Sequence, residues 1–138
     1  TFQTALANAF LYRDVVVAWC GSVCQPDIVA ELADFFVRFD QVDWALAAGL
    51  SDHALKLSLR VTSLGEQSGD VLREVVQGMG NAGGHDRRAG GAIPLTDTSP
   101  EAIEDVLRIV RHRLLERLDV DEQNGCRLLE ACPMIPAP

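Results

Sequence analysis

The sequence lacks any hydrophobic run long enough to cross a lipid bilayer, and its first residues show no signal-peptide pattern. A membrane-spanning helix needs about 20 consecutive apolar residues, whereas the most apolar stretch, Val15–Trp19, is far shorter. We therefore expect a cytoplasmic protein that makes no contact with a membrane. The chain begins with Thr1 rather than Met, so we also expect it to be a piece of a longer protein or a processed product.

Positive charge and aromatic side chains are also scarce. Lys and Arg total 12 against 20 Asp and Glu, which gives a net charge of −8, and aromatic residues make up 6% of the chain. Modules that bind long nucleic acids through their phosphates are usually basic, and many RNA-binding modules stack bases on clustered aromatic rings. The composition argues against such a module. A few local cations can still hold a short anionic ligand, because a pocket responds mainly to its own residues.

The four cysteines lie in two close pairs, Cys20 with Cys24 and Cys126 with Cys132. Neither pair has the C-x-x-C spacing that is typical of zinc sites. Cys20 follows an apolar run, where a free cysteine is commonly a small core residue. We expect free thiols in a reducing cytosol, and a four-cysteine zinc site is the alternative.

The hydrophobic pattern predicts an α/β fold with a single mixed β-sheet flanked by helices, in one domain over residues 1–138. Apolar runs indicate buried strands, and apolar residues three or four apart indicate helices. The predicted strands are Asp14–Trp19, Val42–Gly49, Leu55–Thr62, Ala92–Leu95 and Cys126–Ala131. The predicted helices are Phe2–Leu11, Pro26–Phe39, Asp70–Met79 and Pro100–Leu118.

The strand Leu55–Thr62 alternates between large apolar and polar residues, which is typical of a strand with one face in the core. Its polar face carries the ammonium of Lys56, the hydroxyl of Ser58 and the guanidinium of Arg60. A strand with an ordinary solvated polar face explains this pattern. A ligand-binding face is the alternative, and the strand alone favours the ordinary solvated face.

Residues 78–83 match the G-x-G-x-x-G pattern of dinucleotide-binding proteins. That motif has to follow a strand and begin a helix, so that the pyrophosphate meets the helix N-terminus. Here a helix is predicted before the motif and a strand after it, so we reject a dinucleotide site. We instead predict that Gly78 or Gly80 ends the preceding helix in a left-handed conformation.

The segment Gly83–Gly91, with the sequence GGHDRRAGG, is the strongest candidate for a binding loop. Gly83 and Gly84 lack side chains, so a ligand can approach their backbone N–H groups, and consecutive N–H groups can form an anion-binding concavity. His85 can donate a hydrogen bond to a phosphate oxygen. Arg87 and Arg88 add positive charge at the same place. A surface turn with solvated cations is the alternative.

Three segments together resemble a known family. They are residues 33–46, with ADFF near their start and WAL at their end, residues 57–60 (LSLR), and residues 83–90, with GGH near the start and AG at the end. In this order and spacing they resemble the C-terminal, DHH-associated domain of DHH phosphoesterases, over about Val15–Leu118. This family includes RecJ-like exonucleases and the oligoribonucleases that also act on 3′-phosphoadenosine 5′-phosphate.

The resemblance implies a role for the residues in the matching motifs. In the family this domain closes over the DHH domain and holds the phosphate or the terminal nucleotide of the substrate. By resemblance, Arg60 and His85 contact substrate phosphate, and Gly83 and Gly84 supply backbone donors. Ser58 is a weaker candidate.

The sequence departs from the family pattern on both sides of the GGH motif. Many members have an additional glycine directly before the motif, where this chain has Asn81-Ala82. Arg88 stands where a small alanine is common, and its bulk and charge could change which substrate is accepted.

The resemblance also implies what this chain does not contain. In the family, the separate DHH domain binds two divalent metals, usually manganese. Two-metal hydrolysis needs several carboxylates or imidazoles that converge on the metals, and His53, His85 and His112 do not lie near paired aspartates in the sequence. We therefore expect no catalytic residue, metal ligand or cofactor here, no hydrolysis by this chain alone, and a parent hydrolase whose DHH domain is its partner.

The leading hypothesis is a substrate-binding domain of a metal-dependent phosphoesterase that acts on short oligonucleotides or nucleotides. An RNA-contacting module, like the related C-terminal domain of alanyl-tRNA synthetases, is one alternative. A structural or dimerising domain with a degenerate loop is another, and a homodimer is possible. The substrate and the role of residues after Leu118 stay open.

Overall fold

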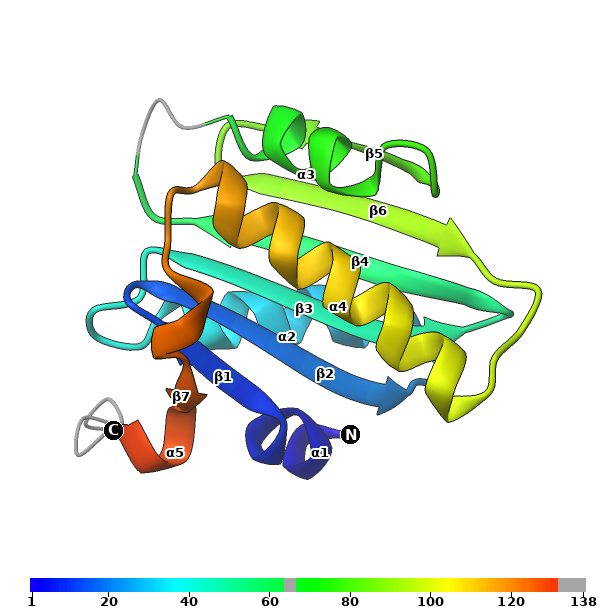
Figure 1. The fold of residues 1–138 in the computed structure, drawn as a ribbon, viewed down its shortest axis with the longest axis horizontal. Helices are drawn as coiled ribbons and strands as arrows, with labels where there is room; N and C mark the ends of the chain where they lie inside the picture. The colour runs from blue at the N-terminus through cyan, green and yellow to red at the C-terminus, as the bar shows by residue number, and fades with distance from the viewer. Residues whose placement is uncertain (64–66, 132–138) are drawn as a thin grey trace.

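A computed structural model describes residues 1–63 and 67–131. It confirms the predicted fold class, with one mixed sheet in the strand order β5-β6-β4-β3-β2-β1-β7 and helices on both faces (Figure 1). Only β2 and β3 pair in parallel, and the other neighbouring strands of the described chain are antiparallel. The strands are β1 (Ala9–Tyr12), β2 (Val15–Ser22), β3 (Trp44–Ser51), β4 (Ala54–Val61), β5 (Asn81–His85), β6 (Arg88–Pro94) and β7 (Cys126–Arg127). The helices are α1 (Phe2–Ala7), α2 (Asp27–Val37), α3 (Ser68–Val76), α4 (Pro100–Arg117), the 3₁₀ turn η1 (Glu122–Asn124) and α5 (Leu128–Ala131).

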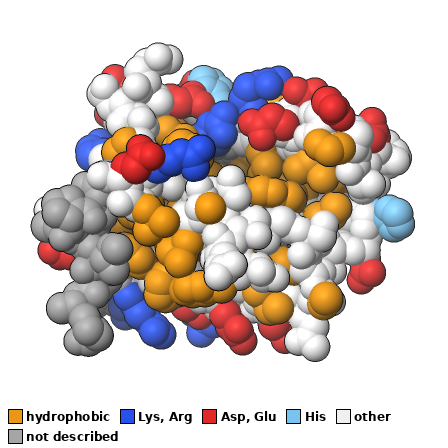
Figure 2. All heavy atoms as spheres, turned by 90° about the horizontal axis from the view of Figure 1, so that it is seen from below, with side chains coloured by type: hydrophobic (Ala, Val, Ile, Leu, Met, Phe, Trp, Pro, Cys, Tyr) orange, Lys and Arg blue, Asp and Glu red, His pale blue; other side chains and the backbone are white. Residues whose placement is uncertain are grey.

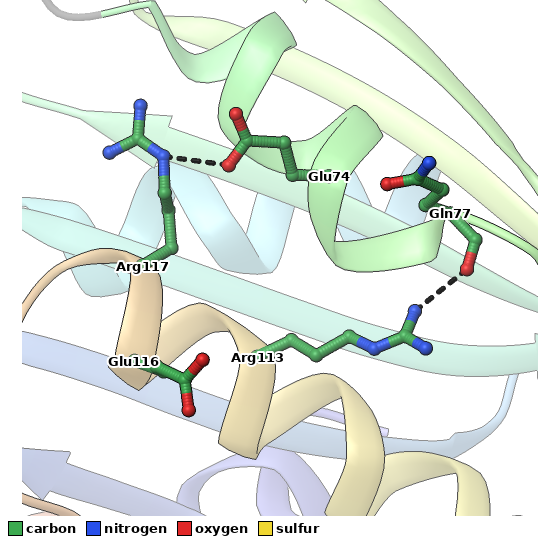
Figure 3. A pocket seen from close by; sticks show the side chains of 5 residues that line it. All are labelled: Glu74, Gln77, Arg113, Glu116 and Arg117. Carbon is green, nitrogen blue, oxygen red and sulfur yellow. Dashed lines mark hydrogen bonds and ion pairs between the residues drawn. The ribbon is translucent and has the colours of Figure 1, made fainter.

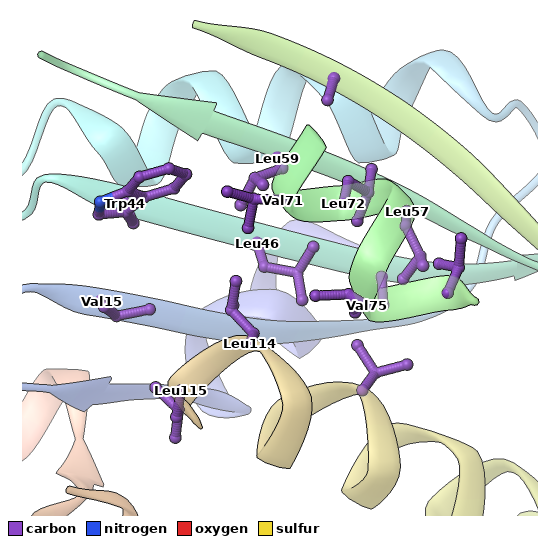
Figure 4. Close-up of a cluster of buried hydrophobic side chains, with 14 of the residues drawn as sticks. Val15, Trp44, Leu46, Leu57, Leu59, Val71, Leu72, Val75, Leu114 and Leu115 are labelled. Carbon is purple, nitrogen blue, oxygen red and sulfur yellow. The ribbon is translucent and has the colours of Figure 1, made fainter. Parts of the chain in front are cut away.

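The sheet separates two hydrophobic cores. On one face, α3 and α4 pack against the leucines of β4 and against Leu46 of β3 (Figure 4). On the other face, α2 packs Phe36 and Val29 against Ala45 and Ala47 of β3. Alternate residues of β3 therefore enter opposite cores, which explains why this strand is almost entirely apolar. No helix in the described ranges is both long and apolar enough to cross a membrane.

The strongest sequence patterns predicted their elements well. The four apolar residues of Leu55–Thr62 are buried in the core beneath α3 and α4, as the alternation predicts. Ser99 caps α4, since its Oγ accepts a hydrogen bond from the Ala102 N–H at 3.2 Å. Gly78 follows α3 with a φ of +80°, the left-handed conformation that glycine adopts most easily. As predicted, the G-x-G-x-x-G segment therefore ends a helix rather than beginning one.

Two terminal predictions were wrong. The helix predicted over Phe2–Leu11 ends at Ala7, and the chain continues as β1, which pairs with the edge of β2. Pairing there satisfies backbone groups that a free sheet edge would leave open. The strand predicted over Cys126–Ala131 has only two paired residues, opposite Phe10 and Leu11, before α5 begins. A strand this short leaves little periodic signal in the sequence.

The surface at the β1 side of the sheet is partly hydrophobic (Figure 2). Phe2 and Leu129 are 48% and 46% exposed, and the Phe2 ring packs edge-on against Phe35 at 5.0 Å. A groove of about 450 Å³ also runs between α4 and strands β1 and β2, and Trp19 and Leu107 are among its lining residues. None of the residues predicted to bind phosphate lies in this groove.

An arginine of α4 holds the end of α3 (Figure 3). Arg113 Nη1 donates hydrogen bonds to the carbonyl oxygens of Val75 and Gln77 at 3.0 and 2.8 Å, and Arg117 pairs with Glu74 at 2.7 Å. The last carbonyl groups of a helix have no partners within the helix, so this cation satisfies two acceptors at its negative end. The contact fixes α3, which in turn packs against β5.

A histidine of α4 forms a hydrogen bond with a glutamate of the turn η1. This contact predicts that the stability of the fold depends on pH. His112 Nδ1 lies 3.0 Å from Glu122 and Nε2 lies 3.2 Å from Glu116, while Arg111 also contacts Glu122. The hydrogen bond with Glu122 raises the pKa of His112 above its ordinary value. A raised folded-state pKa gives stability that is fully present below the unfolded pKa of about 6.5 and is lost as pH rises through the folded pKa.

We therefore expect His112→Gln to lower the urea midpoint more at about pH 6 than at about pH 8.5. The measurement is urea unfolding of both proteins at the two pH values. Glu122→Gln serves as the control background. When His112→Gln is added to Glu122→Gln, the loss of urea midpoint should depend less on pH than it does in the native chain. If His112→Gln lowers the urea midpoint by the same amount at both pH values, the imidazole contributes to stability by packing alone.

Candidate functional site

The predicted glycine-rich loop is a β-hairpin. Residues 81–85 form β5, Asp86 and Arg87 form a two-residue turn, and β6 begins at Arg88, four residues before the predicted strand Ala92–Leu95. Residues 81–85 carry little signal for a strand, because they include no Val, Ile, Thr, Phe, Tyr or Trp. The strand is formed by pairing with β6 and by close packing of α3 against it.

The expected concavity of consecutive N–H groups at Gly83 and Gly84 is not formed. Both residues lie in an extended strand, and neither has a positive φ. Successive N–H groups of a strand point in opposite directions, so only one of the two can point away from β6. An anion-binding nest would need the alternation of right- and left-handed conformations that this backbone lacks.

The hairpin brings three of the predicted phosphate-binding residues into one polar row. Arg88 pairs with Arg60 on β4 and with His85 on β5, so the three residues follow one another across adjacent strands. Directly paired residues of antiparallel strands have their side chains on the same face. The neighbouring residue, Ala89, is buried in the core beneath α3 and α4, so the row faces the opposite side of the sheet, the side of α2. Neighbouring strands lie about 4.8 Å apart, so the row spans roughly 10 Å.

Arg60 is buried and held from three directions. Its side chain is 8% exposed. Its Nε donates a hydrogen bond to Asp34 Oδ1 at 2.6 Å, and its Nη1 donates to the carbonyl oxygens of Leu59 and Ala89 at 3.1 and 3.4 Å. A guanidinium has five N–H donors, and these contacts use the one on Nε and the two on Nη1. The two N–H groups of Nη2 remain, and Nη2 has no hydrogen-bond partner in the described part of the chain. Arg60 can therefore offer a ligand one nitrogen only.

Asp34 is the site residue that sequence reasoning missed. Asp34 falls outside the apolar stripe of α2, a position that periodicity alone assigns to solvent, but it lies against the polar row, with 39% of its side chain exposed. Its Oδ1 accepts the Arg60 hydrogen bond, and its Oδ2 lies 4.0 Å from Nη2 of Arg88. Periodicity shows which side of a helix faces away from the core, but not whether a neighbouring strand carries a cation there.

The remaining predicted residues differ in how accessible they are. Ser58 lies on the same face as Arg60, but it is 7% exposed. Arg87 lies in the hairpin turn, outside the row, and its carbonyl oxygen accepts a hydrogen bond from the Val61 N–H at 3.1 Å. His85 and Arg88 are exposed, and the Arg88 side chain is 71% exposed. A ligand at the surface thus meets Arg88 and His85 first.

The glycines of the hairpin fall into two groups. A Cβ on Gly84 would lie 2.2 Å from the Arg88 carbonyl oxygen, and one on Gly91 would lie 2.9 Å from the Asn81 carbonyl oxygen. The fold itself requires these glycines. A Cβ on Gly83 or Gly90 would meet its nearest atom at 3.9 or 3.8 Å, an ordinary contact, and neither residue has a positive φ.

Gly83 and Gly90 therefore have no structural need to be glycine. They pair with each other beside the polar row, and Gly90 also pairs with Ser58. Both are exposed. Their missing side chains leave the backbone uncovered next to Arg60, Arg88 and His85, and we call this backbone surface the open area. The atom nearest to an added Cβ is Arg73 Nη1 at Gly83 and the Leu57 carbonyl oxygen at Gly90. Glycine at such a position typically allows a ligand to approach the backbone closely.

The start of α3 holds the hairpin turn in place. Ser68 is fully buried, its Oγ donates a hydrogen bond to the His85 carbonyl oxygen at 2.6 Å, and its N–H donates to Asp86 O at 3.0 Å. The next residue, Gly69, packs so closely that a Cβ would lie 2.7 Å from the Gly84 carbonyl oxygen. These contacts fix the backbone that carries His85.

The cysteines and acidic residues do not form a metal site in the part of the chain that the structure describes. Cys20 is buried, which raises its pKa to about 11, while Cys24 and Cys126 are exposed, and all three are free thiols. Cys132 lies outside the described residues. Within residues 1–63 and 67–131, no group of three His, Cys, Asp or Glu side chains could hold a metal ion.

Two solved structures share this fold. The C-Ala domain of alanyl-tRNA synthetase from Aquifex aeolicus superposes with a TM-score of 0.54 at 20% identity, over 75% of this chain and 97% of that domain. An exopolyphosphatase-related protein from Bacteroides fragilis superposes with a TM-score of 0.55 at 15% identity, over 85% of this chain. This chain spans only 34% of that second protein. No curated protein sequence matched the chain.

The sequence itself matches a family. The match to the DHHA1 domain covers residues 13–116, which include β2, α2, the SLR strand β4 and the whole glycine-rich hairpin. The resemblance inferred from the sequence motifs is confirmed by this match, and the chain belongs to the DHHA1 domain family.

Proposed function

We propose that this chain is the substrate-binding domain of a DHH phosphoesterase, and that it binds the phosphate of a short oligonucleotide or a nucleotide on the α2-side face of β4, β6 and β5. The DHH domain of the same parent protein would supply two divalent metals, of which manganese is the best candidate, and would cleave the bond. Family membership and the exopolyphosphatase-related structure, which this chain covers only in part, support this assignment.

One observation carries the proposed site. Gly83 and Gly90 are glycines without a packing reason, and they lie directly beside a row of three potential phosphate ligands. In this arrangement the Arg60 Nη2, the Arg88 guanidinium and the His85 imidazole contact phosphate oxygens, while the sugar or base lies over the open area. The domain thereby positions the phosphodiester for attack, and hydroxide generation belongs to the metal domain.

A backbone-amide NMR titration tests this proposal. We expect a 5′-phosphorylated dinucleotide to shift the amides of Gly83–His85 and Ser58–Arg60, with weak affinity because the metal domain is absent. His85→Asn should weaken binding by about tenfold, as expected for one charge-assisted hydrogen bond. His53→Asn is the matched control, because His53 is exposed in the turn at the other end of β4. Shifts confined to other regions would favour a structural role.

Salt dependence separates this proposal from an RNA-contacting module like the C-Ala domain. A ligand with one or two phosphates should lose affinity with a shallow slope of roughly one to two in log Kd against log salt. A long RNA that runs along the domain should show a much steeper slope and much tighter binding at low salt. Tight, steeply salt-dependent RNA binding without shifts at the hairpin would favour the RNA-contacting function instead.

A further inference from the structure

We propose that Asp34 makes this site selective for a phosphate of single negative charge, so that an internucleotide phosphodiester is bound in preference to a terminal phosphate monoester. This inference rests on the proposed function, since it concerns which phosphate the same face accepts. Asp34 acts as a specificity-determining residue through its position between two cations.

The local charge favours a phosphate with a single negative charge. Asp34 contacts Arg60 at 2.6 Å and lies 4.0 Å from Arg88, so the three side chains together carry a charge of +1. The turn residues Asp86 and Arg87 add charges of opposite sign that cancel. One negative charge on the ligand balances the trio, whereas a second would give the site a net negative charge and would lie next to the Asp34 carboxylate. Like charges within about 6 Å repel even in partly solvated surroundings.

Lys56, on the same face, is too far away to change this balance. It lies four residues from Arg60 along β4, a distance of roughly 13 Å at the usual rise of a strand. Exposed charges at that separation are largely screened at physiological salt, where the Debye length is about 8 Å. Arg73 of α3, whose Nη1 would lie 3.9 Å from a Cβ on Gly83, is paired with Asp70, so the two add no net charge. The charge of the site is therefore set by Asp34, Arg60 and Arg88, with His85 at the end of the row.

The number of hydrogen-bond donors left for a ligand also favours a phosphodiester. The Nε and Nη1 groups of Arg60 are already bonded to Asp34 and to two carbonyl oxygens, so Arg60 offers only Nη2. A phosphodiester has two non-bridging oxygens, one for Arg60 and one for Arg88 together with His85, so the donors of the row are all used. A monoester has three such oxygens and a charge of −1.5 to −2 near neutral pH. Its third oxygen would face the half-exposed carboxylate of Asp34, which can only accept hydrogen bonds.

The test compares adenosine 5′-monophosphate with its methyl ester, which differ by one methyl group and one charge. At about pH 8, where the monoester is a dianion, dissociation constants for both are taken from the amide shifts of the hairpin. We expect the native chain to bind the methyl ester about fivefold more tightly, and Asp34→Asn to remove or reverse this preference by tightening monoester binding about tenfold. Asparagine keeps an oxygen that can accept the Arg60 hydrogen bond.

Glu31→Gln is the matched control, because Glu31 is an exposed carboxylate on the same helix, and its replacement makes the same change in net charge. Equal effects of the two substitutions, or a parallel change for both ligands in Asp34→Asn, would overturn the proposal. The native chain also tests it without any variant, since tighter binding of the monoester dianion contradicts it directly. If neither ligand shifts the hairpin amides of the native chain, the proposed function itself has failed.

Discussion

Replacing Arg60 by methionine is expected to abolish measurable phosphate binding and to lower the free energy of unfolding by about 2 kcal/mol. The side chain is nearly buried and bonds to one carboxylate and two carbonyl oxygens. Removing one partner of a buried ion pair costs about 3–5 kcal/mol, because the other charge is left without compensation. Asp34 is 39% exposed, so water can solvate its carboxylate once the arginine is gone, and the expected loss is smaller.

Urea unfolding measures this loss, and the double variant Arg60→Met/Asp34→Ala separates its two causes. If the unpaired carboxylate accounts for most of the cost, the double variant should be more stable than Arg60→Met alone, which is the signature of coupling between contacting residues. Arg73→Met is the matched control, since Arg73 and Asp70 form an exposed pair within one helix. Such a pair contributes at most about 0.5 kcal/mol.

Equal stability of Arg60→Met and Arg73→Met would show that the Arg60–Asp34 contact adds nothing to the fold. In that case the burial of Arg60 would have to be explained by ligand binding alone. The two readouts are independent, because stability is measured without ligand and binding is measured on the fraction that stays folded at low urea.

The sequence predicted the centre of this fold better than its edges. The strand β4 and helix α4 each carry a strong local signal, strict alternation in one and a Ser-Pro-Glu start in the other, and both formed as predicted. The edge strands β5 and β7, and β1 next to β7, carry weak signals, because they are short or rich in glycine. They form strands because the neighbouring strand of the sheet offers them backbone hydrogen bonds, and this pairing depends on the tertiary structure rather than on the local sequence.

The site likewise combines residues that local sequence predicts with contacts that only the tertiary structure determines. Arg60 and His85 were found by motif, but the row that joins them through Arg88 depends on the register of the hairpin, and no turn signature in Asp86-Arg87 fixed that register. Asp34 could not be found from periodicity, since the contact depends on where α2 crosses the sheet. Sequence identified the chemical groups, and packing determined which of them meet.

The two adjacent glycines of β5 should respond in opposite ways to the same substitution. We expect Gly84→Ala to lower the free energy of unfolding by about 3 kcal/mol and the melting temperature by roughly 10 °C. Its new methyl group would lie 2.2 Å from the Arg88 carbonyl oxygen and 2.5 Å from the Ala89 Cα, and both are backbone atoms that cannot rotate away. Moving them would separate β5 from β6 and disturb the contact of α3 with Gly84.

Gly83→Ala should leave stability unchanged or raise it slightly, by at most about 1 kcal/mol, because its methyl group has room and alanine restricts the unfolded chain. The same methyl group would enter the open area beside the cations and should weaken phosphate binding about tenfold, as one misplaced methyl group commonly does in a binding site. Thermal unfolding and the amide titration, run on both variants, give the comparison. A Gly83→Ala chain that binds as tightly as the native one would show that the ligand does not lie over this strand, whereas destabilisation by both substitutions would mean that the hairpin is glycine-rich for packing alone.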